Sequence, residues 1–204
     1  MERQFSESYV VKVLSGYTLA QQIAFGAACC ERMLPNFQAF ARESGWGDVA
    51  PIRRALDLVW KCAEGWCPSE AEVKAVLREC ERCNPESEDF ESLYTGAAQD
   101  VVSAICAMLE VLQKHSVVKV ASVARFSSDT VDLIVQERED MDPTDPLRER
   151  KILEHPLMQQ ELRRLHRDLA GVAELRTEDI DALRVLRERS RRESNTELEI
   201  SDDG

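Results

Sequence analysis

The sequence predicts a compact all-α bundle of about seven to nine helices. Apolar residues recur every three or four positions through most of the chain, as they do on the buried face of an amphipathic helix. No segment of the 204 residues shows the sustained alternation of apolar and polar residues that half-buried strands require. Capping residues and prolines stand at the ends of the apolar stripes, so each stripe has an expected start and end.

The first long helix is predicted from an apolar stripe that runs from Leu19 to Phe40. A short helical segment over 9–14 precedes it, and Thr18 can cap its first turn. Pro35 lies inside the stripe, and a proline removes a backbone donor and clashes with the carbonyl four residues earlier. Because the stripe keeps its phase across Pro35, we expect one kinked helix with helical structure on both sides.

Two further helices follow a glycine-rich turn. Asp48 is a suitable N-cap for a helix over 49–63, in which the apolar residues again step by three and four positions. Ser69 and Glu72 then have the spacing of a capping box, which predicts a helix that runs to about Cys83.

The middle of the chain contains its most apolar helix. An acidic loop at 86–91 leads into a stripe over 93–112 that leaves only one narrow polar face, as a central and mostly buried helix does. The next apolar segment, 117–139, is interrupted at Ser127 and Ser128. It is therefore either one helix with a weak point or two short helices.

The last third of the chain predicts further helices with their own start signals. Asp145 and Pro146 are suited to an N-cap and a first helical position, and Pro156 starts another helix. The stripe over 158–172 has near-heptad spacing. Thr177 is the expected cap of the last helix.

Composition and charge limit the classes of protein. With 44% hydrophobic residues the chain can bury one core, so we assign 1–200 to a single helical domain and 201–204 to a disordered acidic tail. The net charge of -12 disfavours binding to nucleic acids and to anionic membranes. We find no signal peptide in 1–14, and the longest uncharged stretch, 13–30, is too polar to span a bilayer, which predicts a cytoplasmic protein.

The seven cysteines predict reduced thiols rather than disulfides, because no secretory signal is evident. Most lie on apolar stripes, where a thiol acts as a small hydrophobe. Cys62 and Cys67, followed by Cys80 and Cys83, could supply four thiolates to zinc. Since Cys80 and Cys83 fall on adjacent turns of one predicted helix, we favour packing and expect no metal and no cofactor.

Three segments resemble the signature of the bacterial YjaG-like family, a domain of unknown function: CERMLPNF at 30–37, GWGD at 45–48 and RRALDLVW at 53–60. The signature is specific because it joins proline, glycine, tryptophan and paired charges at fixed offsets. A looser likeness covers nearly the whole chain. The resemblance implies an all-helical fold and carries over no activity. The chain departs from the family in its extra cysteines and in the polar segment 196–199.

The charged residues of this signature form the candidate site. Pro35 leaves the Glu31 carbonyl without its helical donor. One interpretation is a charged clamp, in which Glu31 or Arg32 pairs with the following helix across the helix crossing. The other is a polar pocket beside the kink that binds a small ligand. We favour the clamp, and either interpretation draws on Glu31, Arg32, Asp48, Arg53, Arg54 and Asp57.

Familiar catalytic motifs are missing from the sequence, which has no Glu-x-x-His pair, phosphate-binding loop or nucleophile elbow. One enzymatic hypothesis remains, a Mg²⁺- or Mn²⁺-dependent hydrolase of nucleotide-like substrates. It would use paired carboxylates, Glu88 with Glu91 and Glu137 with Asp140. Both pairs lie in acidic, helix-terminal segments, where a solvated surface is the simpler explanation.

A basic stripe near the end of the chain consists of Arg184, Arg187 and Arg191. It could contact RNA or an acidic partner, but Glu188 and Glu193 offer local neutralisation, which we favour. We therefore expect a non-catalytic protein that acts as an interaction or scaffold protein. Its partners are unidentified proteins, with a homodimer as one candidate, and the metal-dependent hydrolase is the alternative.

Overall fold

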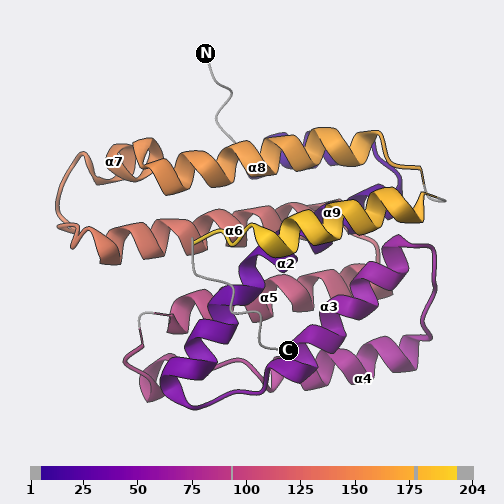
Figure 1. Ribbon diagram of the computed structural model, residues 1–204, viewed down its shortest axis with the longest axis horizontal. Coiled ribbons are helices and arrows are strands. Elements are labelled where there is room, and N and C mark those ends of the chain that lie inside the picture. Colours follow the sequence, from indigo (N-terminus) through magenta and orange to yellow (C-terminus); the bar gives the residue numbers. More distant parts are fainter. Residues whose placement is uncertain (1–5, 93, 177–178, 197–204) are drawn as a thin grey trace.

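The computed structural model describes residues 6–92, 94–176 and 179–196 (Figure 1). This part of the chain forms nine α-helices and one 3₁₀ turn without any strand, which confirms the predicted all-α class. The elements are α1 (Glu7–Leu14), α2 (Leu19–Ser44), α3 (Val49–Ala63), α4 (Glu70–Glu81), η1 (Ser87–Asp89), α5 (Thr95–Gln113), α6 (Val117–Arg138), α7 (Arg148–Glu154), α8 (Pro156–Ala173) and α9 (Ile180–Arg192).

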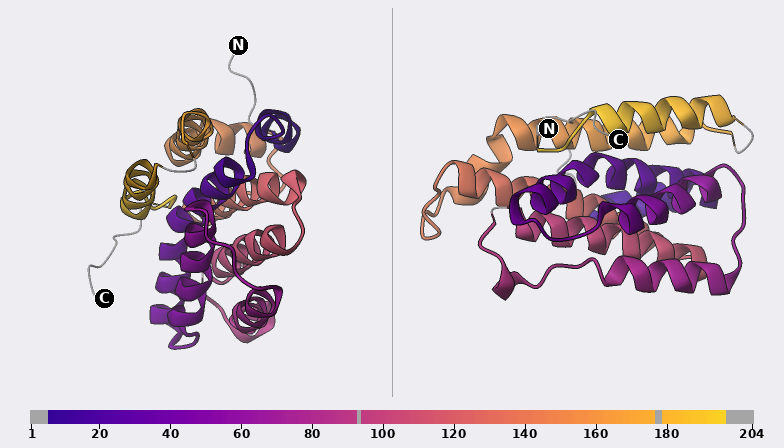
Figure 2. Two further views of the ribbon diagram at one scale, coloured as in Figure 1. Left: turned by 90° about the vertical axis from the view of Figure 1, so that its right-hand side faces the viewer. Right: turned by 60° about the horizontal axis from the view of Figure 1, so that its bottom comes forward.

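The helices stack around α2. In Figures 1 and 2, α8 and α9 lie along one side of the molecule, α4 lies on the opposite side, and α2, α5 and α6 run between them. Helix α2 packs against α3, α5, α6, α8 and α9, while α5 also contacts α3, α4 and α6. Most of the buried side chains belong to one continuous core, and a smaller cluster lies where α6, α7 and α8 meet.

Helix α2 is buried on all sides through its middle. Every residue from Gln22 to Phe37 is buried, whereas an amphipathic surface helix keeps one polar face in water. Small residues make this possible, because they let neighbouring helices approach closely. At Gly26 a Cβ atom would lie 2.3 Å from the Met108 sulfur on α5, so any other residue here would force the Met108 side chain to move.

The structure confirms helix on both sides of Pro35, since α2 is helical from Leu19 to Ser44. At its start, the Thr18 hydroxyl accepts a hydrogen bond from the Gln21 N–H, and the Gln21 side chain accepts one from the Thr18 N–H. This reciprocal pair satisfies two amide groups that the helix itself leaves free. Gly45 ends the helix in the left-handed conformation, with φ of 66°.

The structure decides between the two alternatives for 117–139 and changes one expected helix start. Helix α6 is continuous from Val117 to Arg138, so Ser127 and Ser128 do not divide it. Asp145 does not cap a helix with Pro146 as its first residue, because α7 begins later, at Arg148. Its carboxylate instead accepts a hydrogen bond from the Leu147 N–H at 2.8 Å, within the turn before α7. Asx turns of this kind compete with helix caps for the same side chains.

Two other expectations concern residues outside the described part of the chain. These are the cap at Thr177 and the disordered tail at 201–204. The Asp179 side chain caps α9 by accepting from the Ala182 N–H at 3.0 Å. Among the described helices, α5 is the one long and apolar enough to cross a membrane by length and composition, and 61% of that stretch is buried within the protein.

The ionised form of Asp100 is disfavoured at the contact between α5 and α6. Its carboxylate and the Phe126 carbonyl both lie 2.9 Å from the Thr130 hydroxyl oxygen. A hydroxyl has one hydrogen, so it cannot donate fully to both acceptors. Burial raises the pKa of Asp100 to about 6, and the hydrogen bond from Thr130 only partly opposes this. Protonation would supply the missing hydrogen.

We expect Asp100→Asn to stabilise the protein at pH 8 and to have little effect at pH 4. In the unfolded chain the Asp100 side chain ionises near pH 3.9, below its pKa in the folded protein. The folded state therefore loses stability relative to the unfolded state as the pH rises from about 4 to about 6. An amide avoids this loss and donates to Thr130, which should raise the free energy of unfolding at pH 8 by about 2 kcal/mol. Urea unfolding at both pH values is the measurement, and an equal effect at pH 4 would contradict the account.

Candidate functional site

The candidate site surrounds Pro35 in the middle of α2, where three polar side chains are buried. Glu31, Arg32 and Asn36 are 2%, 0% and 0% exposed. Arg32 and Asn36 are one helical turn apart on the same face, and Glu31 points about a quarter turn away. Each side chain has its own set of partners, which we call the Glu31 cluster, the Arg32 cluster and the Asn36 cluster.

The Glu31 cluster joins α2 to α3. Arg53 donates two hydrogen bonds to the Glu31 carboxylate, at 2.5 and 3.0 Å. The Trp60 indole N–H donates a third at 2.7 Å. A planar guanidinium matches a carboxylate in this two-pronged geometry, which makes such a pair stronger than a single contact. Burial alone would lower the pKa of Arg53, but its bonds to Glu31 raise it above the usual value.

Helix α9 adds two more arginines to the Glu31 cluster. The Nε atoms of Arg191 and Arg187 lie 3.4 and 3.9 Å from the Glu31 carboxylate. Arg187 also donates to Asp57, which accepts from Arg53 Nε at 2.9 Å. Two carboxylates therefore share three guanidinium groups. The cluster carries more positive than negative charge, so its carboxylates are firmly held.

The Arg32 cluster joins α2 to α8 and is sealed from solvent. Arg32 pairs with Glu161 at 3.1 Å and also with Asp168, and all three side chains are fully buried. Burial alone would lower the pKa of Arg32, yet Glu161 and Asp168 raise it above its usual value. The Ser127 hydroxyl, from α6, donates to Glu161 at 2.7 Å, and Arg189, from α9, donates to Asp168 at 2.8 Å.

The Asn36 cluster holds the residues that follow α9. We call Ser194–Thr196 the strap, because it crosses the middle of α2 and is almost fully buried. The Asn36 side-chain amide donates to the Asn195 side chain at 2.9 Å, and the Thr196 hydroxyl donates to the side-chain oxygen Oδ1 of Asn36 at 2.5 Å. The Asn195 backbone N–H donates to the Arg32 carbonyl at 3.2 Å.

The residues predicted from the signature take different positions. Arg53 and Asp57 meet Glu31 at the crossing of α2, α3 and α9, whereas Arg32 points to α8 instead. Arg54 pairs with Glu79 of α4 at 2.9 Å, on the exposed surface. Asp48 caps α3 by accepting from the Ala50 N–H at 2.8 Å and contributes to none of the three clusters.

Glu161 and Asp168 were missed by sequence reasoning, although a signal for them exists. They occupy positions of the α8 stripe that, by its spacing, should be apolar, between Met158, Leu165 and Val172. A charged residue at a buried position needs an opposite charge, so such positions predict a buried ion pair. The burial of the strap could not be predicted from the spacing of apolar residues, because three successive polar residues resemble an exposed segment.

The acidic pairs considered for metal binding lie at the edges of elements. Glu88 belongs to η1 and Glu91 follows it, while Glu137 is near the end of α6 and Asp140 has a φ of 45° beyond it. In the described ranges, no three His, Cys, Asp or Glu side chains are grouped so that they could hold a metal ion. The four cysteines considered for zinc therefore do not form such a group either.

Most of the thiols are buried and resist ionisation. Burial raises the pKa of Cys29 to about 12 and that of Cys62 to about 11. Cys67 is the exposed cysteine, while Cys30, Cys80 and others lie in the core. Since the thiolate is the form that attacks electrophiles and binds metals, buried neutral thiols suit packing rather than catalysis.

We expect Glu31→Gln to cost about 3 kcal/mol of stability, because it removes the buried carboxylate that accepts from Arg53 and from the Trp60 indole N–H. Asp57 has a side chain that is 40% exposed, so water can replace its contacts. We therefore expect Asp57→Asn to cost less than about 1 kcal/mol. Urea unfolding of both variants at pH 7 compares the two sites. Equal losses, or no loss in Glu31→Gln, would show that the Glu31 cluster does not hold the helices together.

Comparison with known proteins places this fold among uncharacterised relatives. The chain is 27% identical over 170 residues to the uncharacterized protein YjaG of Escherichia coli K12, a match covering 82% of this chain and 83% of that protein. The YjaG protein of Salmonella typhimurium is 25% identical over the same length. A crystal structure of a DUF416 family protein from Shewanella baltica superposes with a TM-score of 0.84 at 27% identity, covering 93% of this chain and 98% of that one.

The resemblance to the YjaG-like family is thus confirmed over most of the chain. The family model described as "Protein of unknown function (DUF416)" matches residues 10–201, which include α2, the candidate site and the strap. We conclude that the chain belongs to the DUF416 family of proteins of unknown function.

Proposed function

We propose that the protein acts by docking a protein partner at the end of the bundle where α2 and α9 begin and α3 ends. Three large apolar side chains are exposed there or in the adjoining loop. Leu19, Trp66 and Ile180 are 46%, 45% and 48% exposed. We call these three residues the end surface. Exposed apolar side chains on several elements at one end of a bundle can form a protein interaction site, and their position at this end carries the proposal.

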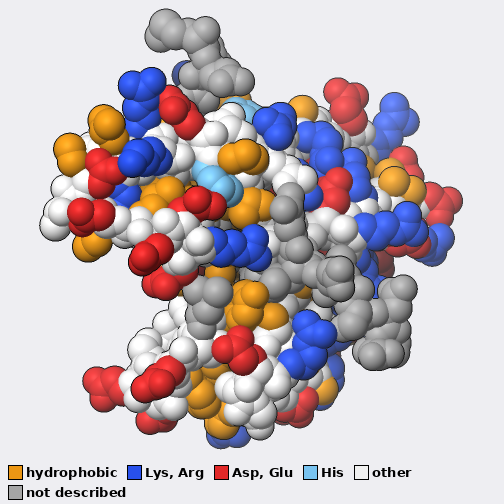
Figure 3. All heavy atoms as spheres, turned by 60° about the vertical axis from the view of Figure 1, so that its left-hand side comes forward, with side chains coloured by type: hydrophobic (Ala, Val, Ile, Leu, Met, Phe, Trp, Pro, Cys, Tyr) orange, Lys and Arg blue, Asp and Glu red, His pale blue; other side chains and the backbone are white. Residues whose placement is uncertain are grey.

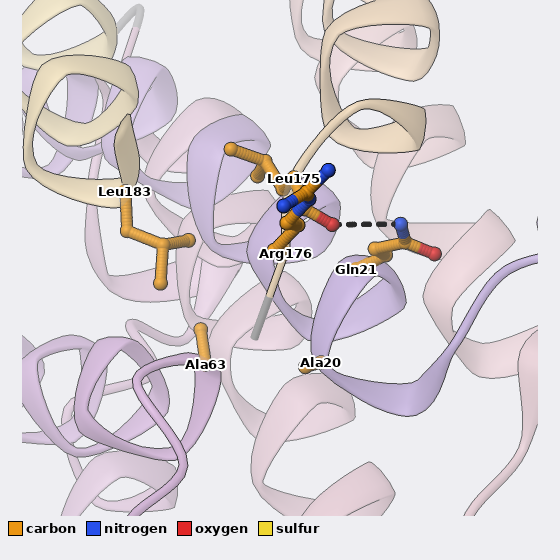
Figure 4. A pocket seen from close by; sticks show the side chains of 6 residues that line it. All are labelled: Ala20, Gln21, Ala63, Leu175, Arg176 and Leu183. Carbon is orange, nitrogen blue, oxygen red and sulfur yellow. Dashed lines mark hydrogen bonds between the residues drawn. The ribbon is translucent and has the colours of Figure 1, made fainter. Parts of the chain in front are cut away.

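A small depression supports the grouping of these residues. Ala20, Ala63, Leu175 and Leu183 line it together with Gln21 and Arg176 (Figure 4). Leu19 precedes Ala20, Ile180 lies one turn before Leu183, and Trp66 follows Ala63 by three residues. Leu19 and Ile180 therefore belong to α2 and α9, which help to form the depression, and Trp66 lies in the loop that follows α3.

The depression is too small for a metabolite. Its volume is about 10 Å³, close to the space of one water molecule. The Gln21 amide donates to the carbonyls of Ala173 and Leu175 at 3.1 and 3.0 Å, which ties the end of α8 to α2. A fixed, shallow surface of this kind suits the apolar side chains of a partner better than an enclosed small ligand.

The charges beside the end surface indicate the chemistry of the partner. The Lys61 ammonium lies 5.9 Å from the centre of the Trp66 ring, and Arg176 lines the depression. Acidic side chains are exposed in the same segments, among them Glu64 and Asp181, so we expect a partner with an apolar patch and charged residues of both signs at its rim. No grouping of carboxylates in the described residues supports the metal-dependent hydrolase.

We expect the triple variant Leu19→Asp, Trp66→Ser, Ile180→Asp to lose its partner while remaining folded. The matched control is Leu147→Asp, Leu153→Asp, which changes side chains that are 54% and 41% exposed beside or on α7, at the opposite end of the bundle. Capture from native extract with quantitative mass spectrometry compares the parent protein and both variants. For proteins that are captured by the parent and by the control, the captured amount should be at least tenfold lower with the triple variant.

Equal capture by both variants would contradict the proposal. Light scattering during gel filtration measures the molar mass of the protein and so tests whether the partner is a second copy of the chain. In that case the parent and the control would be dimers and the triple variant a monomer.

A further inference from the structure

We infer that the groove that holds the strap is a peptide-binding groove, in which the chain's own Ser194–Thr196 can be exchanged for a Ser-Asn-Thr-like segment of a partner protein that adopts the same turn. This goes beyond the proposed function, because the groove and the end surface are separate. The strap itself shows what kind of occupant fits.

The groove has walls that do not depend on the strap. Asn36 comes from α2, Ser127 and Arg138 come from α6, and Arg164 comes from α8. These three helices pack directly on one another, and the Arg32 cluster links all of them. Removing the strap would therefore leave the groove in place.

The groove binds the main chain of three successive residues. Arg164 donates to the Ser194 carbonyl at 2.8 Å, and Arg138 donates to the Thr196 carbonyl at 3.1 Å. Between them, the Asn195 N–H donates to the Arg32 carbonyl at 3.2 Å. Contacts to backbone groups hold a peptide segment in place whatever its side chains, which is how many peptide-binding domains obtain affinity.

Side-chain contacts add selectivity for asparagine and threonine. The Asn36 side-chain amide donates to Asn195 and accepts from the Thr196 hydroxyl, so it contacts the side chains of both residues. The Asn195 amide also donates to the Ser127 carbonyl at 3.2 Å. A site built to hydrogen-bond a polar side chain discriminates strongly against residues that lack it, because its own polar groups would stay unpaired.

The floor of the groove has polar capacity that the strap does not use. Ser127 lies between Asn195 and Glu161, and the second carboxylate oxygen of Glu161 is buried without a hydrogen-bond partner among the described atoms. Arg32 Nε, in the same cluster, is also unpartnered.

The strap is well suited to exchange. It inserts no apolar side chain, and its hydrogen bonds can be replaced by those of water or of another peptide at small net cost. Helix α9 is held separately, by the burial of Leu183 and Leu186 and by the contacts of Arg187 and Arg191 with the Glu31 cluster. The strap can therefore leave the groove while α9 stays in place.

The test uses a fluorescein-labelled peptide with the sequence of residues 192–199, RESNTELE, and the full chain. In the parent protein the resident strap competes with the peptide. Asn195→Ala in the protein weakens the strap, so fluorescence anisotropy should show at least tenfold tighter peptide binding than to the parent. A peptide with alanine in place of asparagine should bind the same variant at least tenfold more weakly.

Equal binding to the two proteins, absence of binding to a folded Asn195→Ala variant, or equal binding of the two peptides would each overturn the inference. The triple variant of the end surface should bind the labelled peptide like the parent, which separates this inference from the proposed function.

Hydrogen exchange of the parent protein gives a second test that does not depend on any variant. The Asn195 N–H should exchange at least 100-fold faster than the buried amides in the middle of α5, because the strap opens without unfolding the core. Equal exchange rates would mean that the strap leaves only on global unfolding, and the inference would fail.

Discussion

The fold depends on a full positive charge at the centre of its most buried helix. Moving a charged group out of water costs several kcal/mol, and only opposite charges with good hydrogen-bond geometry can offset this cost. Arg32 finds these charges on α8, in Glu161 and Asp168. The position and rotation of α8 are therefore constrained by one guanidinium group, and Ser127 and Arg189 bring α6 and α9 to the same place.

The neighbouring residue imposes the same constraint on the other side of α2. Glu31 needs positive charges, which Arg53 supplies from α3 and Arg187 and Arg191 supply from α9. Helix α9 buries few apolar side chains, so its ion pairs matter more than those of the other helices. Asn36 lies one helical turn beyond Arg32 and hydrogen-bonds the strap. Adjacent polar residues thus organise both the packing of the bundle and the groove from which we infer exchange.

Sequence reasoning succeeded where the information is local. The spacing of apolar residues predicted the helices, and the unbroken phase across Pro35 predicted helix on both sides. The partners of Arg32 were not predicted, because Glu161 and Asp168 lie 129 and 136 residues away and helical periodicity says nothing about such distances. Ser127 was read as a weak point of a helix, although it is a hydrogen-bond donor in a buried cluster. The end surface depends on which elements meet at one end, which no local pattern reports.

A double-mutant cycle on Arg32 and Glu161 tests the central claim most directly. Arg32→Met leaves Glu161 buried with Ser127 as its remaining donor among the described residues, and Glu161→Gln removes the matching charge. We predict that each single variant loses about 3 kcal/mol in urea unfolding, and that the double variant loses at least about 2 kcal/mol less than the sum. Losses that add to within about 0.5 kcal/mol would contradict the claim that this buried pair organises the fold.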